Sequence, residues 1–132
     1  MGGFIARYAI IGLGKIGTAI AKSLIKSGVD PSNISGSVRR VESINRVRHE
    51  LPGVFVTTNN AEVVKDADIV ILAVKPYQVL DALMPIRNVL NSDQLLISVV
   101  AGGVTTSIIE GVVPSKVIRA MPNIGIVIER GG

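Results

Sequence analysis

Two short loops, far apart in the sequence, constrain the fold of this chain most. The first, residues 12–17, reads Gly-Leu-Gly-Lys-Ile-Gly and directly follows the apolar run Tyr8–Ile11. The second, residues 73–76, reads Ala-Val-Lys-Pro and closes another apolar run, residues 68–74. In a sheet of parallel strands both loops would lie at the carboxyl ends of the strands, where such sheets bind nucleotides. The sequence therefore predicts a nucleotide-binding α/β domain.

The composition is typical of a folded domain of this class. The chain has 132 residues, of which 48% are hydrophobic, 18% are charged and only 3% are aromatic. A core of Ile, Val, Leu and Ala suits a buried parallel sheet that is covered by helices. The absence of cysteine excludes disulfides, cysteine-bound zinc and thiol catalysis. No apolar run is long enough to span a membrane, so we expect a cytoplasmic protein with no membrane partner.

The charge distribution favours a small anionic ligand over a nucleic acid. The formal net charge is +4, and the basic residues are dispersed apart from a loose cluster, Arg39, Arg40, Arg46 and Arg48. Proteins that bind single-stranded nucleic acid interleave such residues with aromatic side chains, which are rare here. We therefore expect a phosphorylated small molecule, and no nucleic acid, as the partner.

Apolar runs alternate with helical patterns along the whole chain. This alternation predicts right-handed crossovers and a doubly wound parallel sheet of the Rossmann type, with helices on both faces and strand order 3-2-1-4-5-6. Residues 16, 19, 20 and 24 should form the buried stripe of the first helix, and Pro85 should restart a helix. The expected strands cover residues 8–11, 34–38, 54–57, 68–74, 95–100 and 116–121, with a further one in the tail, 124–132. The expected helices cover residues 15–27, 42–51, 61–65, 76–83 and 106–110.

The three glycines of the first loop each have a distinct expected role. Gly12 permits the sharp turn from strand to helix, Gly14 lets a pyrophosphate approach the backbone, and Gly17 lets the helix pack closely on the strand. The N-terminus of the helix would then bind the phosphates. The alternative is a tight turn with a purely structural role.

The end of the second strand predicts which dinucleotide is bound. A site that prefers NAD has a carboxylate there, which holds the 2′-hydroxyl of the ribose. This chain instead has Ser37, Arg39 and Arg40, and Glu42 comes too late. A hydroxyl and two guanidinium groups suit a 2′-phosphate, so NADP(H) is favoured, NAD(H) remains a candidate, and Arg39 is the stronger of the two arginines. The alternative is that both arginines are merely solvated.

Other loops supply further candidates at the same edge. Asn60 could cap the following helix, contact the adenosine ribose, or do both, and Asn59 competes for either role. Lys75 is held extended by the proline that follows it, which leaves backbone groups available at the sheet edge. Its side chain could be a catalytic acid or that of an ordinary surface lysine. Ala101 and Gly102 would allow close approach of a ligand, and the amide of Asn123 would reach toward the nicotinamide. The spacing of the aspartates does not match a metal-binding loop, and no catalytic side chain is identified.

Together, these motifs resemble the pyrroline-5-carboxylate reductase family. The matching segments are residues 11–17 (Ile-Gly-Leu-Gly-Lys-Ile-Gly), Arg39, residues 67–76 (Ala-Asp-Ile-Val-Ile-Leu-Ala-Val-Lys-Pro), residues 96–102 and residues 117–123, which end in Met-Pro-Asn. The resemblance covers nearly the whole chain in the expected order. It departs after Asn123, where the family usually has Thr-Pro and this chain has Ile-Gly.

The resemblance implies roles for individual positions. Ser37 and Arg39 would meet the adenosine phosphate, and Asn60 would meet the adenosine ribose. The positions expected along the pyrophosphate are Ile11, Gly12, Leu13, Gly14, Lys15 and Ile16. Those expected beside the nicotinamide are Ala73, Val74, Lys75, Pro76, Val100, Ala101 and Gly102.

The family reduces 1-pyrroline-5-carboxylate to proline with a hydride from NAD(P)H. The resemblance therefore implies that residues 1–132 form its dinucleotide-binding domain and that the small-molecule substrate is a cyclic imino acid. The helical domain through which family members dimerise and bind substrate would be absent from this chain. Two alternatives remain open: another NADP-dependent reductase of the β-hydroxyacid or deazaflavin-linked type, and a non-catalytic nucleotide-binding module.

Overall fold

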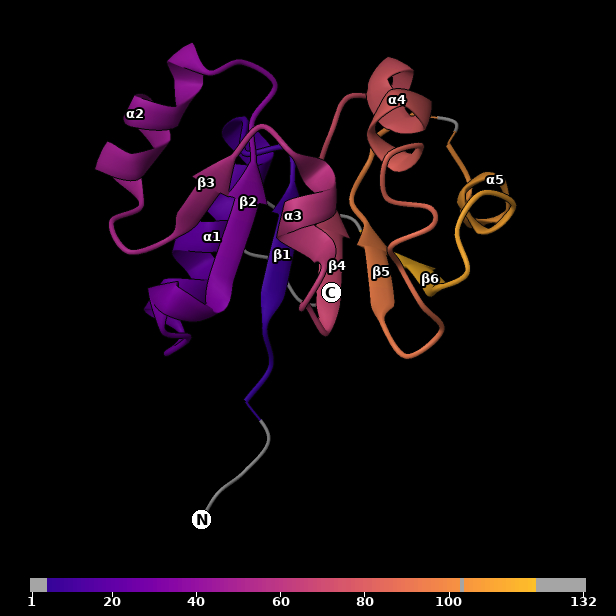
Figure 1. Ribbon diagram of the computed structural model, residues 1–132, viewed down its shortest axis with the longest axis horizontal. Coiled ribbons are helices and arrows are strands. Elements are labelled where there is room, and N and C mark those ends of the chain that lie inside the picture. Colours follow the sequence, from indigo (N-terminus) through magenta and orange to yellow (C-terminus); the bar gives the residue numbers. More distant parts are fainter. Residues whose placement is uncertain (1–4, 103, 121–132) are drawn as a thin grey trace.

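Residues 5–102 and 104–120 are described by a computed structural model, which shows one parallel sheet covered by helices (Figure 1). The strands are β1 (Tyr8–Ile11), β2 (Ile34–Ser37), β3 (Phe55–Thr57), β4 (Ile69–Leu72), β5 (Leu95–Ser98) and β6 (Lys116–Arg119). The helices are α1 (Lys15–Lys26), α2 (Glu42–Glu50), α3 (Asn60–Val64), α4 (Val79–Leu83) and α5 (Thr106–Glu110), with 3-10 turns η1 (Pro31–Asn33) and η2 (Pro76–Gln78).

The strand order is β3-β2-β1-β4-β5-β6, and every pair is parallel. The central strand β1 places Ile11 opposite Ser37 of β2 and opposite Leu72 of β4. All strands therefore end at one edge, which is the upper edge in Figure 1. The predicted doubly wound Rossmann-type fold is confirmed.

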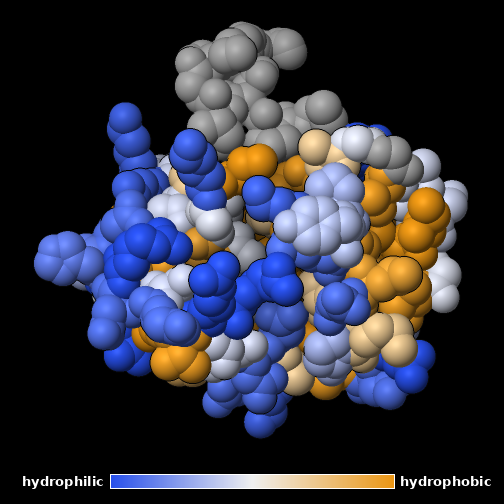
Figure 2. All heavy atoms as spheres, turned by 90° about the horizontal axis from the view of Figure 1, so that it is seen from above, coloured by the Kyte–Doolittle hydropathy of each residue, from blue (hydrophilic) through white to orange (hydrophobic). Residues whose placement is uncertain are grey.

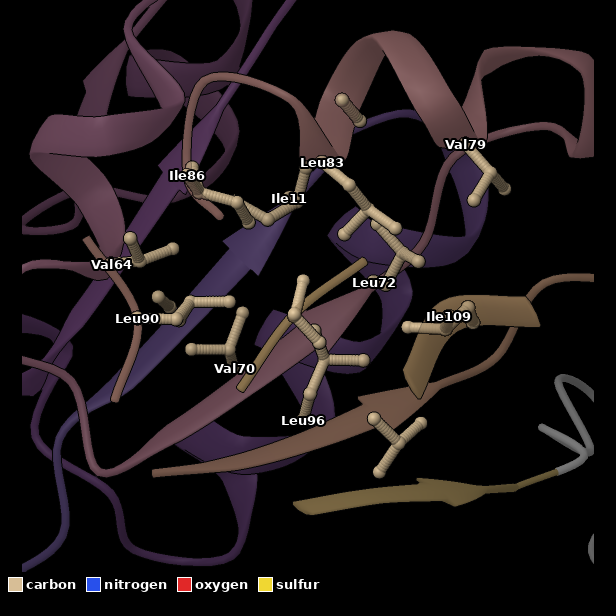
Figure 3. Close-up of a cluster of buried hydrophobic side chains, with 14 of the residues drawn as sticks. Ile11, Val64, Val70, Leu72, Val79, Leu83, Ile86, Leu90, Leu96 and Ile109 are labelled. Atoms are coloured by element: carbon tan, nitrogen blue, oxygen red, sulfur yellow. The ribbon is translucent and has the colours of Figure 1, made fainter. Parts of the chain in front are cut away.

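The two faces of the sheet bury separate hydrophobic clusters. Along β1, Ala9 and Ile11 enter the cluster beneath α3, α4 and α5, whereas Ile10 enters the cluster beneath α1 and α2. This alternation follows from the two-residue period of a strand. Figure 3 shows the first cluster, in which Leu72 and Leu96 of neighbouring strands meet side chains from the helices. Burial on both faces explains the nearly continuous apolar runs in the sequence.

Helix α1 differs from its predicted buried stripe. The structure buries Gly17, Thr18 and Ala21, and it leaves Ile16 39% exposed. The reason is that the closest contact between helix and strand occurs at Gly17, which turns Ile16 away from the sheet. The prediction that Ile16 belongs to the core face was wrong.

The cap of α3 and the segment after Pro85 also differ from the prediction. Asn59, and not Asn60, is the N-cap, since its Oδ1 accepts hydrogen bonds from the N–H groups of Ala61 and Glu62 at 3.0 and 3.3 Å. Pro85 does not restart a helix; the chain continues in turns closed by bonds such as Ile86 N–H to Leu83 O, 3.0 Å. These turns carry Ile86 into the core, where it is 0% exposed.

The strands that end beside the site are shorter than predicted. The ladder of β4 stops at Leu72 and that of β5 stops at Ser98, although the Ala73 N–H still donates to Ile11 O at 2.9 Å. Beyond these points the chain leaves the sheet and lines a cleft. The expected strand in the tail and the end of the sixth strand, Met121, lie outside the described residues. In the described ranges, no helix has both the length and the apolar character needed to cross a membrane.

Candidate functional site

The glycine turn after β1 is held between the ends of β2 and β4. Gly12 has φ +99°, a conformation that L side chains rarely adopt. A Cβ atom at this position would lie 3.0 Å from the carbonyl oxygen of Ala73. On the other side, the N–H of Leu13 donates to the carbonyl of Ser37 at 2.7 Å. Glycine is therefore required here by backbone conformation and by the closeness of β4.

The first turn of α1 has the properties of an anion site. Gly14 is its N-cap and offers no side chain to the backbone N–H groups, and the turn has no acidic residue. A Cβ atom added to Gly14 would have no neighbour within 4 Å, so the space beside it is open. Uncapped N–H groups and the helix dipole favour negative charge at this position. The geometry therefore fits a phosphate group.

An open cleft of about 380 Å³ extends from this turn along the carboxyl edge of the sheet. At the β2 end it is lined by Arg39, Ser43 and Arg46, and at the β5 end by Val99 and Ala101, with the glycine turn between them. Figure 2 views this edge and shows hydrophilic side chains gathered on the α2 side and hydrophobic ones toward α4 and α5. One end of the cleft is thus basic and the other is apolar.

A smaller cleft of about 150 Å³ adjoins the first on the side of α3 and α4, and both are lined by Gly12 and Arg39. Ser37 lies at its base, 3% exposed, and its Oγ accepts the Gly12 N–H at 3.2 Å. Ser37 therefore supports the glycine turn directly, and its hydroxyl hydrogen is still able to donate. Asn60 also lines this cleft, and its Nδ2 donates to Ala82 O at 3.3 Å, which connects α3 to α4.

Lys75 takes the extended conformation that was predicted for a residue before proline. Its φ and ψ are −73° and 153°, and its N–H donates to Oε1 of Gln78 at 3.1 Å. The N–H of Gln78 returns a bond to Lys75 O at 2.8 Å. This reciprocal pair fixes the loop after β4, so the backbone beside the cleft is rigid while the exposed ammonium group remains in solvent.

The structure brings most of the predicted site residues together. The larger cleft is lined by residues 12–16, Arg39, residues 73–76 and Ala101, and the smaller one adds Ile11, Ser37 and Asn60. Arg40 and Gly102 line neither cleft, although Gly102 lies next to Pro76. Asn123 lies outside the described residues.

Val100 was expected in the site, but its side chain is 1% exposed and belongs to the core beneath α5. Its neighbour Val99 lines the cleft instead. The cause is the alternation of side chains at the end of β5, which sends consecutive residues to opposite faces. The sequence did not reveal which of the two valines faces the ligand side.

Besides Val99, four residues that line the larger cleft were not among the predicted site residues: Val38, Ser43, Arg46 and Gln78. Ser43 and Arg46 are three residues apart on α2, which places them on one face of that helix. The signal that could have identified Ser43 and Arg46 is this three-residue spacing on the helix that follows Arg39.

The described residues form no cluster of side chains that could hold a metal ion. No group of three or more His, Cys, Asp or Glu residues gathers in the described ranges.

The pKa of Asp30 is lowered because its carboxylate accepts hydrogen bonds from the backbone N–H and the hydroxyl of Ser32. Asp30 precedes β2 and so lies at the opposite edge of the sheet from the clefts.

Known proteins of similar sequence and structure include several reductases. The family model described as "NADP oxidoreductase coenzyme F420-dependent" matches residues 7–102, more than half of the chain. The pyrroline-5-carboxylate reductase of Methanosarcina acetivorans is 37% identical over 123 residues, which cover 89% of this chain and 44% of that protein.

Two solved structures agree with this result. The pyrroline-5-carboxylate reductase of Coxiella burnetii matches with a TM-score of 0.83 and 32% identity, over 91% of this chain and 45% of its own. The pyrroline carboxylate reductase of Plasmodium falciparum, solved with NADP bound, matches with a TM-score of 0.74 and 26% identity, over 92% and 44%. The chain therefore spans less than half the length of these relatives. It belongs to the family described as NADP oxidoreductase coenzyme F420-dependent, and over most of its own length it is similar to pyrroline-5-carboxylate reductases.

Proposed function

We propose that this chain is the NADPH-binding domain of a pyrroline-5-carboxylate reductase. The observation that carries the proposal is the uncapped first turn of α1, which faces open space beside Gly14 and begins a cleft across the carboxyl edge. A relative solved with NADP bound has the same fold over 92% of this chain. The pyrophosphate of the dinucleotide would lie against residues 12–16, and Asn60 would meet the adenosine ribose.

The residues at the β2 end fit the phosphate form of the cofactor. Arg39 lines both clefts, and the described end of β2 has no carboxylate to hold a free 2′-hydroxyl. Guanidinium groups bind phosphate through paired N–H donors. Ser37 would contribute its hydroxyl hydrogen while its oxygen keeps the Gly12 N–H. We therefore propose NADP(H) as the preferred dinucleotide, with NAD(H) binding more weakly.

At the other end of the cleft, this chain would position and shield the nicotinamide. When bound, NADPH supplies a hydride, which in this family goes to the C=N carbon of 1-pyrroline-5-carboxylate. The residues there, Val99, Ala101 and Pro76, are apolar and small and would exclude water. The hydrogen-bonded loop of Lys75 and Gln78 would fix the position of this wall. No side chain of this chain is proposed as a proton donor.

The proposal includes a second domain to complete the active site, because the chain spans less than half of its relatives. Residues 1–132 would form the dinucleotide-binding domain, and a helical domain would supply dimer contacts and most of the site for the cyclic imino acid. We also propose a cytoplasmic location for the enzyme.

A second reductase function is favoured by one observation, the description of the matched family as coenzyme F420-dependent. On that view the chain would belong to a reductase that uses a deazaflavin. The similarity to pyrroline-5-carboxylate reductases over 89% of the chain supports the first proposal more strongly.

Calorimetric titration with NADPH, NADH and coenzyme F420, in separate experiments, tests the proposal. We expect NADPH to bind at least about tenfold more tightly than NADH, since one charge-assisted contact contributes about that factor. Tight binding of coenzyme F420 alone would overturn the proposal. So would a titration in which none of the three cofactors binds. A reductase assay of the enzyme that contains this domain, with 1-pyrroline-5-carboxylate and a panel of keto acids, then identifies the substrate.

A further inference from the structure

A second arginine faces the basic end of the larger cleft, from a different element than Arg39. Arg39 follows β2, whereas Arg46 lies in the middle of α2, and both line the cleft together with Ser43. Ser43 and Arg46 project from one face of α2 because they are three residues apart. Two arginines from different elements therefore line the same cleft.

Arg40 is the residue that sequence adjacency suggests as the partner of Arg39, but its position does not support that role. Arg40 is exposed and lines neither cleft. Arg46 follows Arg39 by seven residues, and the turn from β2 into α2 brings it to the cleft.

Arg46 is also paired with a carboxylate. Its Nη1 lies 2.9 Å from Oε1 of Glu50, one helical turn further along α2. The other carboxylate oxygen of Glu50 lies 3.5 Å from Nζ of Lys22 on α1. These side chains are between 38% and 56% exposed, so the pairs are solvated and can exchange partners easily.

We propose that Arg46 is a second specificity-determining residue, which clamps the 2′-phosphate of the dinucleotide opposite Arg39, and that Glu50 is its built-in counter-ion. This inference rests on the proposed binding of NADP(H). In the free protein, Glu50 orients Arg46 and engages Nη1, and the guanidinium keeps further N–H donors for a phosphate. A 2′-phosphate carries more charge than the single carboxylate and competes with it for Arg46. A 2′-hydroxyl does not, so Arg46 favours NADPH over NADH.

Glu50 adjusts this preference through its own charge. Because it is paired with Arg46, which lines the cleft, its negative charge weakens the attraction of that region for anions in general. Removing the charge should therefore strengthen phosphate binding, mainly at low salt, where charges at exposed positions are poorly screened.

The test compares four single variants by calorimetric titration with NADPH and with NADH: Arg46→Gln, Glu50→Gln, Arg39→Gln and Arg48→Gln. Arg48 is the matched control, since it lies on the same helix, is exposed, and lines neither cleft. Circular dichroism melting curves show whether each variant is folded. Adenosine 2′,5′-bisphosphate and ADP serve as smaller probes of the same phosphate.

We expect Arg46→Gln to weaken NADPH about three- to tenfold and NADH less than about twofold, as for the loss of one charged hydrogen-bond partner. Glu50→Gln should strengthen NADPH about two- to threefold at low ionic strength and lose this gain in high salt. Arg48→Gln should change both affinities by less than about twofold.

Two results would overturn the inference while the proposed function stands: Arg46→Gln behaving like Arg48→Gln, or Arg46→Gln weakening NADPH and NADH equally. An unchanged NADPH affinity in Glu50→Gln would remove the counter-ion role. If the unaltered chain binds neither dinucleotide, the proposed function fails and this inference fails with it.

Discussion

Gly17 packs so closely against Gly12 that a Cβ atom on Gly17 would overlap the carbonyl oxygen of Gly12. The contact joins the first turn of α1 to the end of β1, and no side chain can be accommodated between them. It also sets the angle at which the N-terminus of α1 meets the cleft. The stability of the domain and the position of its anion site therefore depend on the same pair of glycines.

Replacing Gly17 with alanine should destabilise the domain. The added methyl group meets backbone that cannot move aside cheaply, so we expect a loss of about 3 kcal/mol, the upper range for overpacking. Chemical denaturation monitored by circular dichroism measures the change. Unaltered stability would show that α1 can shift and that the close packing is not required.

Replacing Gly14 with alanine should change the stability of the domain little and weaken the binding of NADPH. Its Cβ atom would enter open space, so the free energy of unfolding should change by less than about 1 kcal/mol, as for other substitutions at an N-cap. The methyl group would occupy the position proposed for the pyrophosphate, and NADPH affinity should fall at least about tenfold. Calorimetry and denaturation on one preparation test both parts, and normal affinity would exclude the pyrophosphate from this position.

Changing Asn59 or Asn60 to alanine should affect stability and NADPH binding differently. Asn59 caps α3, so its loss should cost about 1 kcal/mol of stability and leave NADPH binding unchanged. Asn60 lines the smaller cleft, so its loss should weaken NADPH binding. Its bond to Ala82 predicts an accompanying, smaller loss of stability. If Asn59→Ala proves to be the variant that weakens binding, the assignment is wrong.

Gln94 lies in the core on the far side of the molecule from the site, and replacing it tests the stability of that part of the core. It is 5% exposed, and its Nε2 donates to the carbonyl oxygens of Val64 and Ala67 at 2.8 and 2.7 Å. Gln94→Leu removes these donors and should destabilise the domain by about 2 kcal/mol, because the carbonyl of Ala67 loses a buried partner. Ser92→Ala, a neighbouring exposed position, is the control. NADPH affinity should not change in either variant.

The strand order and the glycine turn could be predicted because they depend on local pattern. Nearly continuous apolar runs, separated by helical stripes, lead to one sheet topology, and positions 12 and 17 need glycine for reasons of backbone conformation and space. Lys75 was likewise predicted to be extended, since the following proline imposes that conformation.

Side-chain direction at the ends of the elements could not be predicted in the same way. Whether Val99 or Val100 lines the cleft depends on where the β5 ladder stops. The approach of Arg46 to the cleft depends on how α2 packs against the sheet, and the cap at Asn59 is displaced by a single residue from the expected one. Such features follow from tertiary packing, which a local pattern does not contain.

The most direct test of the proposed site is amide NMR of this 13.9 kDa chain during titration with NADPH. We predict that the largest shifts occur at the amides of residues 14–17, with further shifts at Arg39, residues 73–75 and Ala101. Shifts confined to the opposite edge of the sheet, around Arg7, Ser35 and Asp66, would contradict this prediction.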